Sequence, residues 1–355
     1  MVNLSLALLV IIWSIPTFGL LVSSFRTRFD IQTSGWWSIF PHREWKTVST
    51  LDPKELGLDP DGVMQVEGVE GTFKELRDGV LSPDGSTRVT WIGNKRLGRI
   101  EVQKRVWTVT WDFTLDNYKQ VLVARDIELK NPDGSVEVIP GQDMSQAFLN
   151  SLAVSIPSTV IPILIAAFAA YAFAWMEFPG RRVMFIMVVG LLVVPLQIAL
   201  VPILRDYKAL GLNGTFLAIW LAHTGFGLAL ATYLLFNYIR TLPRETLESA
   251  FIDGASHFTV FLRLILPLSV PALASFAIFQ FLWVWNDYLV ALVFLGTDPN
   301  FKVVTQRLAD LTGTFGNDWH LLTAGAFVTM ILPLIVFFAL QRYFVRGLLA
   351  GSIKG

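Results

Sequence analysis

The segment Glu248–Pro267, ESAFIDGASHFTVFLRLILP, places polar side chains between two long apolar stretches. Pro243 and the acidic residues that follow it suit a helix start, because proline fits the first turn and carboxylates favour the positive end. Asp253-Gly254 then breaks the helix, since glycine adopts positive φ at no steric cost. Glu248 is available for an ion pair. The pattern indicates a surface for another protein, and an ordinary solvated loop is the alternative.

The segment also contains small side chains, at Ser249, Ala250 and Ala255, so another protein can approach its surface closely. Together with Glu248, Asp253 and Gly254 they are the residues that we expect to make the contact. Both alternatives remain open on these residues alone.

The rest of the chain offers little other chemistry. It has no cysteine, and its four histidines have no metal-ligand spacing. It contains no Gly-x-x-x-x-Gly-Lys-Ser/Thr loop for ATP and no evident pair of nucleophile and base. A net charge of zero provides no basic field for nucleic acid. We therefore expect no catalytic residue, no metal and no cofactor.

The composition is that of a membrane protein. Of 355 residues 53% are hydrophobic and 16% are charged, against about a quarter charged in soluble proteins. Apolar runs long enough to cross a bilayer predict six transmembrane helices. They are Leu4–Phe25, Phe148–Trp175, Val183–Leu204, Phe216–Tyr238, Leu264–Leu295 and Leu321–Tyr343. The first run could instead be a cleaved signal peptide, but it lacks a positive start and is long for one.

A polar stretch separates the first two spans. Residues 26–146 carry three Pro-Asp-Gly turn signals at Pro60, Pro83 and Pro132, and β-prone runs such as RVTWIG, KRVWTVTW and SVEVIP. We expect a β-rich insertion built from hairpins, which either contacts an extracellular partner or is a solvated addition. The predicted domains are thus a transmembrane helix (1–25), the insertion (26–146), a helical core (147–343) with a cytoplasmic loop (239–263), and a tail (344–355).

Basic residues in the short loops predict the orientation. One set of loops and the tail carry Arg181, Arg182, Arg240, Arg244, Arg263, Arg342, Arg346 and Lys354, whereas the other set carries Arg205, Lys208, Lys302 and Arg307. The richer set is expected in the cytoplasm, together with both termini, and the insertion outside.

The spans contain few ionisable residues, with Asp287 as the main exception. A secondary transporter would bury such residues along an ion path, and a channel would need a pore motif, which is not evident. If the protein pumps, energy must enter from another chain through the cytoplasmic segment around Asp253. The alternative from a different class is a non-transporting membrane scaffold with a receptor domain outside.

The same segment resembles a known family. Its polar loop matches the "EAA" loop of bacterial ABC importer permeases at Glu248, Ala250, Asp253, Gly254, Ala255, Phe261 and Pro267, with Ser249 in place of an alanine. FTLDNYKQVL, FLNSLAVSIPSTVIP, AAYAFAWMEFPGRR, WVWNDYLVAL and LQRYFVRGLLAGSIKG resemble the maltose-type carbohydrate branch. These stretches cover the chain except for about residues 40–110, an insert similar to that of α-glucoside permeases.

The resemblance implies an all-α polytopic fold, with one helix added to a five-helix core, and a β-rich extracytoplasmic insertion after the first helix. It implies a permease subunit of a sugar importer, an oligosaccharide or α-glucoside importer, in the bacterial or archaeal cytoplasmic membrane. The implied partners are a second permease, a dimeric ATPase docked on the loop, an extracytoplasmic sugar-binding protein and the sugar. The tail would reach the ATPase interface, with a frayed terminus as the alternative. A permease for a non-sugar solute is the alternative function.

A polar and aromatic stripe in the fifth span is the candidate substrate path. If one helix runs through it, Gln280, Trp283, Asp287 and Tyr288 lie along one side, with Asn286 beside them. Aromatic rings and hydrogen-bonding groups suit a sugar. The alternative is structural packing at the outer membrane boundary. For His223 and the hydroxyl-rich face of the second span (Ser151, Ser155, Ser158 and Thr159), helix packing is favoured over a place in the path.

Overall fold

The computed structural model describes residues 2–123, 127–130, 136–139, 144–311 and 318–352. Its contacts divide the chain into two compact units, residues 1–22 with 26–113 and residues 23–25 with 114–355. The chain is mostly helical, with strands in the stretch between the first two long helices. The domain boundaries given above stay predictions.

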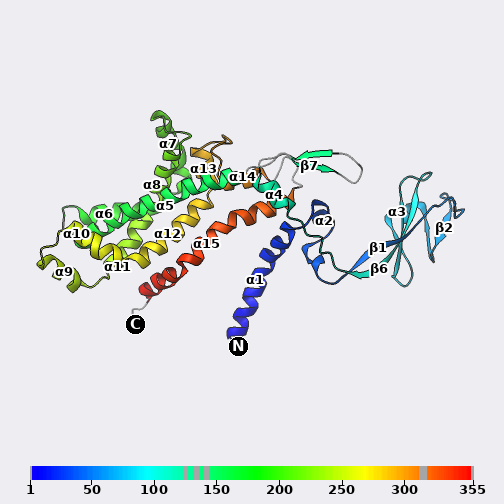
Figure 1. Ribbon diagram of the computed structural model, residues 1–355, viewed down its shortest axis with the longest axis horizontal. Coiled ribbons are helices and arrows are strands. Elements are labelled where there is room, and N and C mark those ends of the chain that lie inside the picture. The colour runs from blue at the N-terminus through cyan, green and yellow to red at the C-terminus, as the bar shows by residue number, and fades with distance from the viewer. Residues whose placement is uncertain (1, 124–126, 131–135, 140–143, 312–317, 353–355) are drawn as a thin grey trace. The chain divides into compact units, whose positions relative to one another are not determined.

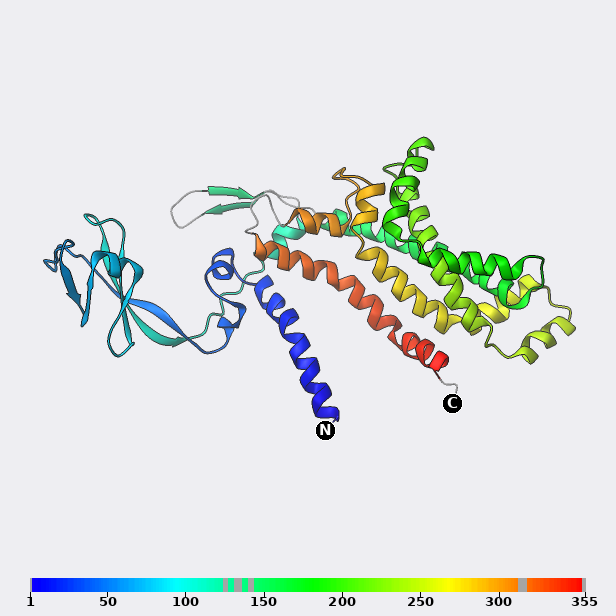
Figure 2. The same cartoon turned by 180° about the vertical axis from the view of Figure 1, so that it is seen from behind.

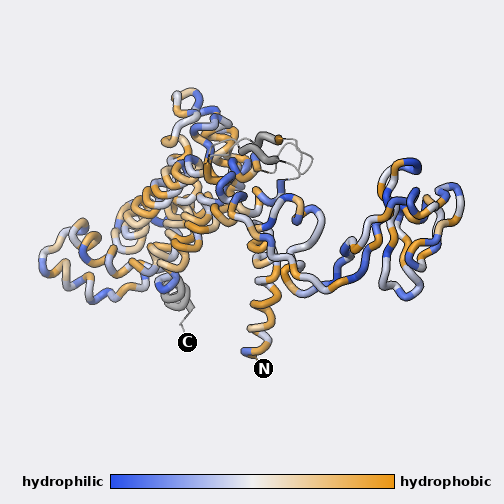
Figure 3. The backbone as a smooth tube through the Cα atoms, turned by 45° about the vertical axis from the view of Figure 1, so that its right-hand side comes forward, coloured by the Kyte–Doolittle hydropathy of each residue, from blue (hydrophilic) through white to orange (hydrophobic). Residues whose placement is uncertain are grey.

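The first unit begins with α1 (Val2–Ser24), which is apolar along its length (Figure 3). Two short helical segments follow, α2 (Arg28–Thr33) and the 3₁₀ segment η1 (Trp36–Ile39). A four-stranded antiparallel sheet then has the order β1-β6-β5-β4, and a separate hairpin pairs β2 with β3. Their bounds are β1 (His42–Leu51), β2 (Val63–Val66), β3 (Val69–Thr72), β4 (Val80–Leu81), β5 (Thr87–Ile92) and β6 (Arg99–Thr108), with the short helix α3 (Phe73–Asp78) after β3.

Alternation along the strands buries one face of this small domain. Met64, Leu76, Trp91 and Ile100 are almost fully buried in a single apolar cluster. The Pro83 turn signal joins β4 to β5 as predicted. At its centre, hydroxyls of Ser82 and Ser86 donate to the Asp84 carboxylate and lower its pKa to about 2.

The other two turn signals have different outcomes. The Pro60 signal forms a turn ahead of β2, in which the amide of Gly62 donates to the carbonyl of Asp59 at 3.1 Å. The β2–β3 hairpin itself turns at Glu67-Gly68, both with positive φ. The Pro132 signal lies outside the described residues, although β7 (Ile127–Lys130) and β8 (Val136–Ile139) on either side of it are paired.

The second unit is helical, and its long helix α5 (Met144–Trp175) packs against α8 (Phe216–Ile239) and α12 (Val270–Trp285). Figures 1 and 2 show α5 running along this unit, with α4, α13 and α14 at one end and α9 to α11 at the other. The remaining helices are α4 (Asp116–Leu122), α6 (Arg181–Gly190), η2 (Leu191–Val193), α7 (Leu196–Ala209), α9 (Arg244–Ile252), α10 (His257–Val260), the π-helical segment η3 (Phe261–Ile265), α11 (Leu266–Leu268), α13 (Leu289–Phe294), α14 (Val304–Asp310) and α15 (Trp319–Ser352).

Two of the six predicted spans are not straight helices. Within the described residues four helices are long and apolar enough to cross a membrane, and six spans result if each bent pair counts as one. The third predicted span bends by 104° between η2 and α7, where Pro195 interrupts the helix. The fifth bends by 71° next to Ser269, followed by Val270-Pro271, and its helix ends at Trp285. Proline removes a backbone donor and clashes with the preceding turn, which accounts for the breaks.

The helix α15 continues through most of the predicted tail, to Ser352. Lys354 and the two residues beside it, which the sequence suggested for a contact with another chain, lie outside the described residues. The contact of the tail stays a prediction.

Candidate functional site

The polar segment forms a helix-turn-helix, in agreement with the helix start and break expected from its sequence. Pro243 precedes α9, and Asp253 is its C-cap. Gly254 has a φ of 83° and donates its amide hydrogen to the carbonyl of Phe251 at 3.0 Å. Ser256 then caps α10 by accepting from a backbone amide. Positive φ is strained for any residue with a Cβ, so the turn requires glycine at this position.

One face of α9 packs on the helical core. Leu247 is fully buried in a cluster that also contains Tyr171 of α5 and Leu235 of α8. Ala250 and Ala255 are half-buried against the same cluster. Their small size therefore fits α9 to the core, and of the three small residues only Ser249 belongs to the outer surface.

The other face of α9 is open. Glu248, Ser249, Asp253 and Gly254 are exposed, and so is Ile252, at 85%. Sequence reasoning missed Ile252, although its spacing of four residues from Glu248 places both on one side of the helix. An apolar side chain beside carboxylates is typical of a protein contact, where the centre is apolar and the rim polar.

Two predicted residues of the segment lie away from this open face. Phe261 is buried and stacks on Phe168 of α5, with ring centroids 4.0 Å apart. Pro267 is exposed on α11, just before the bend at Ser269. If another chain binds α9, Phe261 would contribute by packing the segment onto α5 and not by direct contact.

A polar link joins the helix-turn-helix to α5. The hydroxyl of Tyr171 and Nδ1 of His257 are 2.8 Å apart, and the His257 ring also packs against Phe251 at 4.8 Å. Tyr171 is 4% exposed whereas His257 is exposed, so this hydrogen bond is partly buried. Arg244 adds a second tie, because its guanidinium lies over the ring of Trp175 at the end of α5. The segment is thus fixed to the ends of the spans.

The polar residues of the fifth span are split by the end of α12. The prediction that Gln280, Trp283, Asp287 and Tyr288 share one helix is wrong, because α12 ends at Trp285 and α13 begins at Leu289. Asp287 and Tyr288 lie in the break between them.

Gln280 is a buried crosslink between three helices. Its Nε2 donates to the carbonyl of Ser158 on α5 at 3.1 Å and to that of His223 on α8 at 3.4 Å. Gly227 lies against the same amide, and a Cβ there would come within 2.6 Å of it. Gln280 therefore has a clear packing role.

Asp287 and Asn286 are also used locally. The Asp287 carboxylate accepts from the amide of Ala291 at 3.1 Å in the first turn of α13, and it lies 3.9 Å from Nε2 of His223. Asn286 donates its side-chain amide back to the carbonyl of Leu282. Trp283 and Tyr288 keep large exposed ring surfaces.

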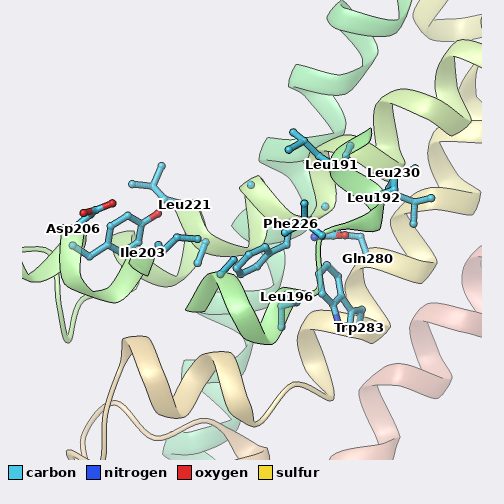
Figure 4. Close-up of a pocket in the computed structure, with 17 residues that line it drawn as sticks. Leu191, Leu192, Leu196, Ile203, Asp206, Leu221, Phe226, Leu230, Gln280 and Trp283 are labelled. Carbon is cyan, nitrogen blue, oxygen red and sulfur yellow. The ribbon is translucent and has the colours of Figure 1, made fainter. Parts of the chain in front are cut away.

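A cavity of about 560 Å³ lies between η2, α7, α8 and α12. Gln280 and Trp283 line it, whereas Asn286, Asp287 and Tyr288 do not (Figure 4). Most of its other lining is apolar, including Leu196 and Phe226, and the carboxylate of Asp206 is at the opposite end. The cavity lies beside the bend between η2 and α7, and no periodicity in the sequence predicts that bend.

Comparison with known proteins identifies the family. Residues 148–349 match the family described as "Binding-protein-dependent transport system inner membrane component". The chain belongs to this family. The permease is 49% identical to the alpha-glucoside transport system permease protein AglG of Rhizobium meliloti, over 100% of this chain and 97% of that protein. It is a transport permease and not an enzyme, which agrees with the resemblance found in the sequence.

Two further similarities were found. The permease is 45% identical to the osmoprotective compounds uptake permease protein GgtD of Synechocystis sp., over 99% of this chain and 91% of that protein. It also aligns with a chain of a crystal structure of a bacterial ABC transporter that imports the acidic polysaccharide alginate. That alignment has 21% identity and a TM-score of 0.49, and it covers 68% of this chain and 84% of that chain.

Proposed function

We propose that this permease is the transmembrane subunit of an ATP-driven sugar importer, with an α-glucoside or a related oligosaccharide as its solute. The identity of 49% to an alpha-glucoside permease along the whole chain carries this proposal. The expected partners are a second permease, a dimeric ATPase and an extracytoplasmic binding protein. Both termini and α9 would face the cytoplasm, as the basic loops indicate.

The open face of α9 would be the ATPase contact. Ile252 would enter an apolar pocket of the ATPase, with Glu248 and Asp253 at the polar rim. ATP binding can drive the permease only through contacts that differ between its two states. Because Leu247 and His257 fix the segment to α5 and α8, a displacement of α9 would move the ends of those spans and switch access across the membrane.

Co-purification of the ATPase with the tagged permease in mild detergent tests the contact. We expect Ile252→Asp, and separately Glu248→Ala with Gly254→Pro, to lose the ATPase, because a charge or a distorted turn cannot dock. Leu210→Asp is the matched control, since Leu210 is also a highly exposed aliphatic residue (70%, against 85% for Ile252) and lies in the loop predicted on the other side. If the variants and the control all retain the ATPase, α9 is not the docking site.

The cavity beside Gln280 and Trp283 would be part of the solute path. Trp283 offers a partly exposed ring (39%) for stacking on a sugar, and Gln280 offers amide atoms. We expect Trp283→Ala to raise the KM for uptake about tenfold, the equivalent of about 1.4 kcal/mol. Trp319→Ala is the control, because Trp319 is exposed (54%) but does not line the cavity. An unchanged KM would remove Trp283 from the path.

The similarity to an osmoprotective compounds permease favours a second solute class, small osmoprotective compounds. Uptake of a labelled α-glucoside and of a labelled osmoprotectant, each competed by the other, separates the two. Uptake of neither, with the ATPase still bound, would point to the non-transporting scaffold instead.

A further inference from the structure

A group of exposed aromatic side chains surrounds the start and end of the insertion in the first unit. This aromatic collar comprises Phe29, Trp37, Phe40, Trp111 and Phe113, which are between 52% and 72% exposed. Soluble surfaces expose large apolar rings singly, whereas a contiguous group marks an interaction site. The function proposed above does not use these residues.

Backbone and side-chain hydrogen bonds hold together the segments that carry the collar. The amide of Thr110 donates to the carbonyl of Ser38 at 3.0 Å, and Nε1 of Trp111 donates to the carbonyl of Ile39 at 2.8 Å. Arg26 pairs with Phe113 through a β-bridge. The Arg26 side chain is almost fully buried, and its guanidinium donates to the backbone carbonyls of Asp30 in α2 and of Ser34 at its C-cap. The rings are therefore presented by an ordered scaffold.

Trp36, the residue before Trp37 of the collar, packs against the side of α1. The ring of Trp36 makes an edge-to-face contact with Phe18, with centroids 5.9 Å apart. Gly19 permits this approach, since a Cβ there would come within 2.6 Å of Nε1 of Trp36. Trp37 and Phe40 lie next to Trp36, at 6.3 and 6.4 Å between ring centroids.

The position of that contact along α1 fixes its depth in a membrane. Helix α1 has 23 residues and is a candidate span. It rises about 34 Å against a hydrocarbon core of about 30 Å. Phe18 lies six residues before the last residue, Ser24, which is about 9 Å along the axis. When α1 spans the bilayer, the Trp36 contact is therefore within the outer boundary of the membrane and not beyond it.

We propose that the aromatic collar is inserted in the headgroup region of the outer leaflet and anchors the insertion to the lipid surface. Trp side chains suit this zone, because the ring is apolar and the indole N–H can donate to a polar partner. Because the collar adjoins α1, which is a candidate membrane span, we infer that lipid covers the exposed rings. This inference depends on α1 crossing the membrane and not on which solute is carried.

Site-directed spin labelling of the full chain in nanodiscs of phosphatidylcholine and phosphatidylglycerol tests the anchor. The chain has no cysteine, so a single introduced cysteine is labelled without background. The collar variants are Trp37→Cys and Trp111→Cys. Leu9→Cys, within the apolar length of α1, marks the membrane interior, and Glu55→Cys, on an exposed turn of the same insertion, marks water. Val109→Cys repeats the collar measurement without removing a tryptophan.

The readout is the ratio of collisions with oxygen, which partitions into lipid, to collisions with a water-soluble nickel complex. We expect the collar labels to exceed Glu55→Cys about threefold or more and to remain below Leu9→Cys, as the interface requires. A ratio equal to that of Glu55→Cys would overturn the proposal. Exclusion of both reagents would also overturn it, because the collar would then be covered by protein. Failure of uptake or of ATPase docking would leave this result unaffected.

Discussion

The two candidate sites of the helical unit both adjoin helix α8, but their polar groups are arranged in opposite ways. On α9 the charged groups of Glu248 and Asp253 point outward, and the buried face is apolar. Between the spans, Gln280 and Asp287 are hydrogen-bonded within the unit, and the cavity, which Gln280 lines and Asp287 does not, has a mostly apolar lining. If α9 binds another protein, as proposed, its charged groups are expected to be exposed, whereas polar groups between spans must be hydrogen-bonded, because hydrocarbon offers no partners.

Of the substitutions that test this comparison, Gly254→Pro should have the largest effect, on ATPase docking and uptake. Proline cannot adopt a φ of 83° and removes the amide that donates to Phe251, which together weaken the docking surface by about 3 kcal/mol or roughly a hundredfold. Uptake into vesicles should fall by that factor. Gly211→Pro is a close control, since Gly211 also follows a helix, with φ of 69° and an amide donated to Lys208. Equal losses of ATPase docking from both variants would show a general folding defect.

Gly227→Ala should have the second largest effect, because it lowers the stability of the helical unit and does not weaken ATPase docking. The new methyl group would meet the Gln280 amide at 2.6 Å, and overpacking of this kind costs about 1–3 kcal/mol. Thermal unfolding in detergent should move to lower temperature, with the ATPase still bound. Gly225→Ala, two residues earlier on α8 and with open space around its Cβ, should change little. A similar shift from both would mean that Gln280 is not tightly packed.

Tyr171→Phe should have the smallest effect, on the link between the two regions. The change removes one partly buried hydrogen bond to His257, worth about 0.5–1.5 kcal/mol. The ATPase should remain bound, while stimulation of ATP hydrolysis by solute falls a few-fold. Tyr233→Phe, on the partly exposed side of α8, is the control. Unchanged stimulation would mean that motion passes from α9 to the core through packing of Leu247 alone.

The helix-turn-helix could be predicted from the sequence because its signals are local. A proline start, carboxylates in the first turn and Asp-Gly at the end determine where α9 begins and stops, whatever surrounds it. The same holds for the Pro83 turn, where the side chain of Asp84 accepts from its neighbours. The Pro60 signal also makes a turn, although the hairpin of β2 and β3 closes farther along, at Glu67-Gly68.

The path could not be predicted in this way. The periodicity argument assumed an unbroken helix from Leu264 to Leu295. In the structure the helix bends at Ser269 and ends at Trp285. Apolar composition alone made these positions candidates for a span, but it carries no information about where a helix bends. The exposure of Ile252 was equally hidden, because isoleucine on a short helix is as compatible with a core as with an interface.

By itself the sequence determined the membrane character, the β-containing insertion, the family and the helix-turn-helix with its glycine turn. Each of these depends on composition or on neighbours within a few residues. Only the tertiary structure decided which face of α9 is open, that Gln280 joins three helices, that the cavity lies beside a bent span, and that Trp36 packs on α1. Those features arise from contacts between segments far apart in the chain, where packing and hydrogen-bond satisfaction select one arrangement among many that the local sequence permits.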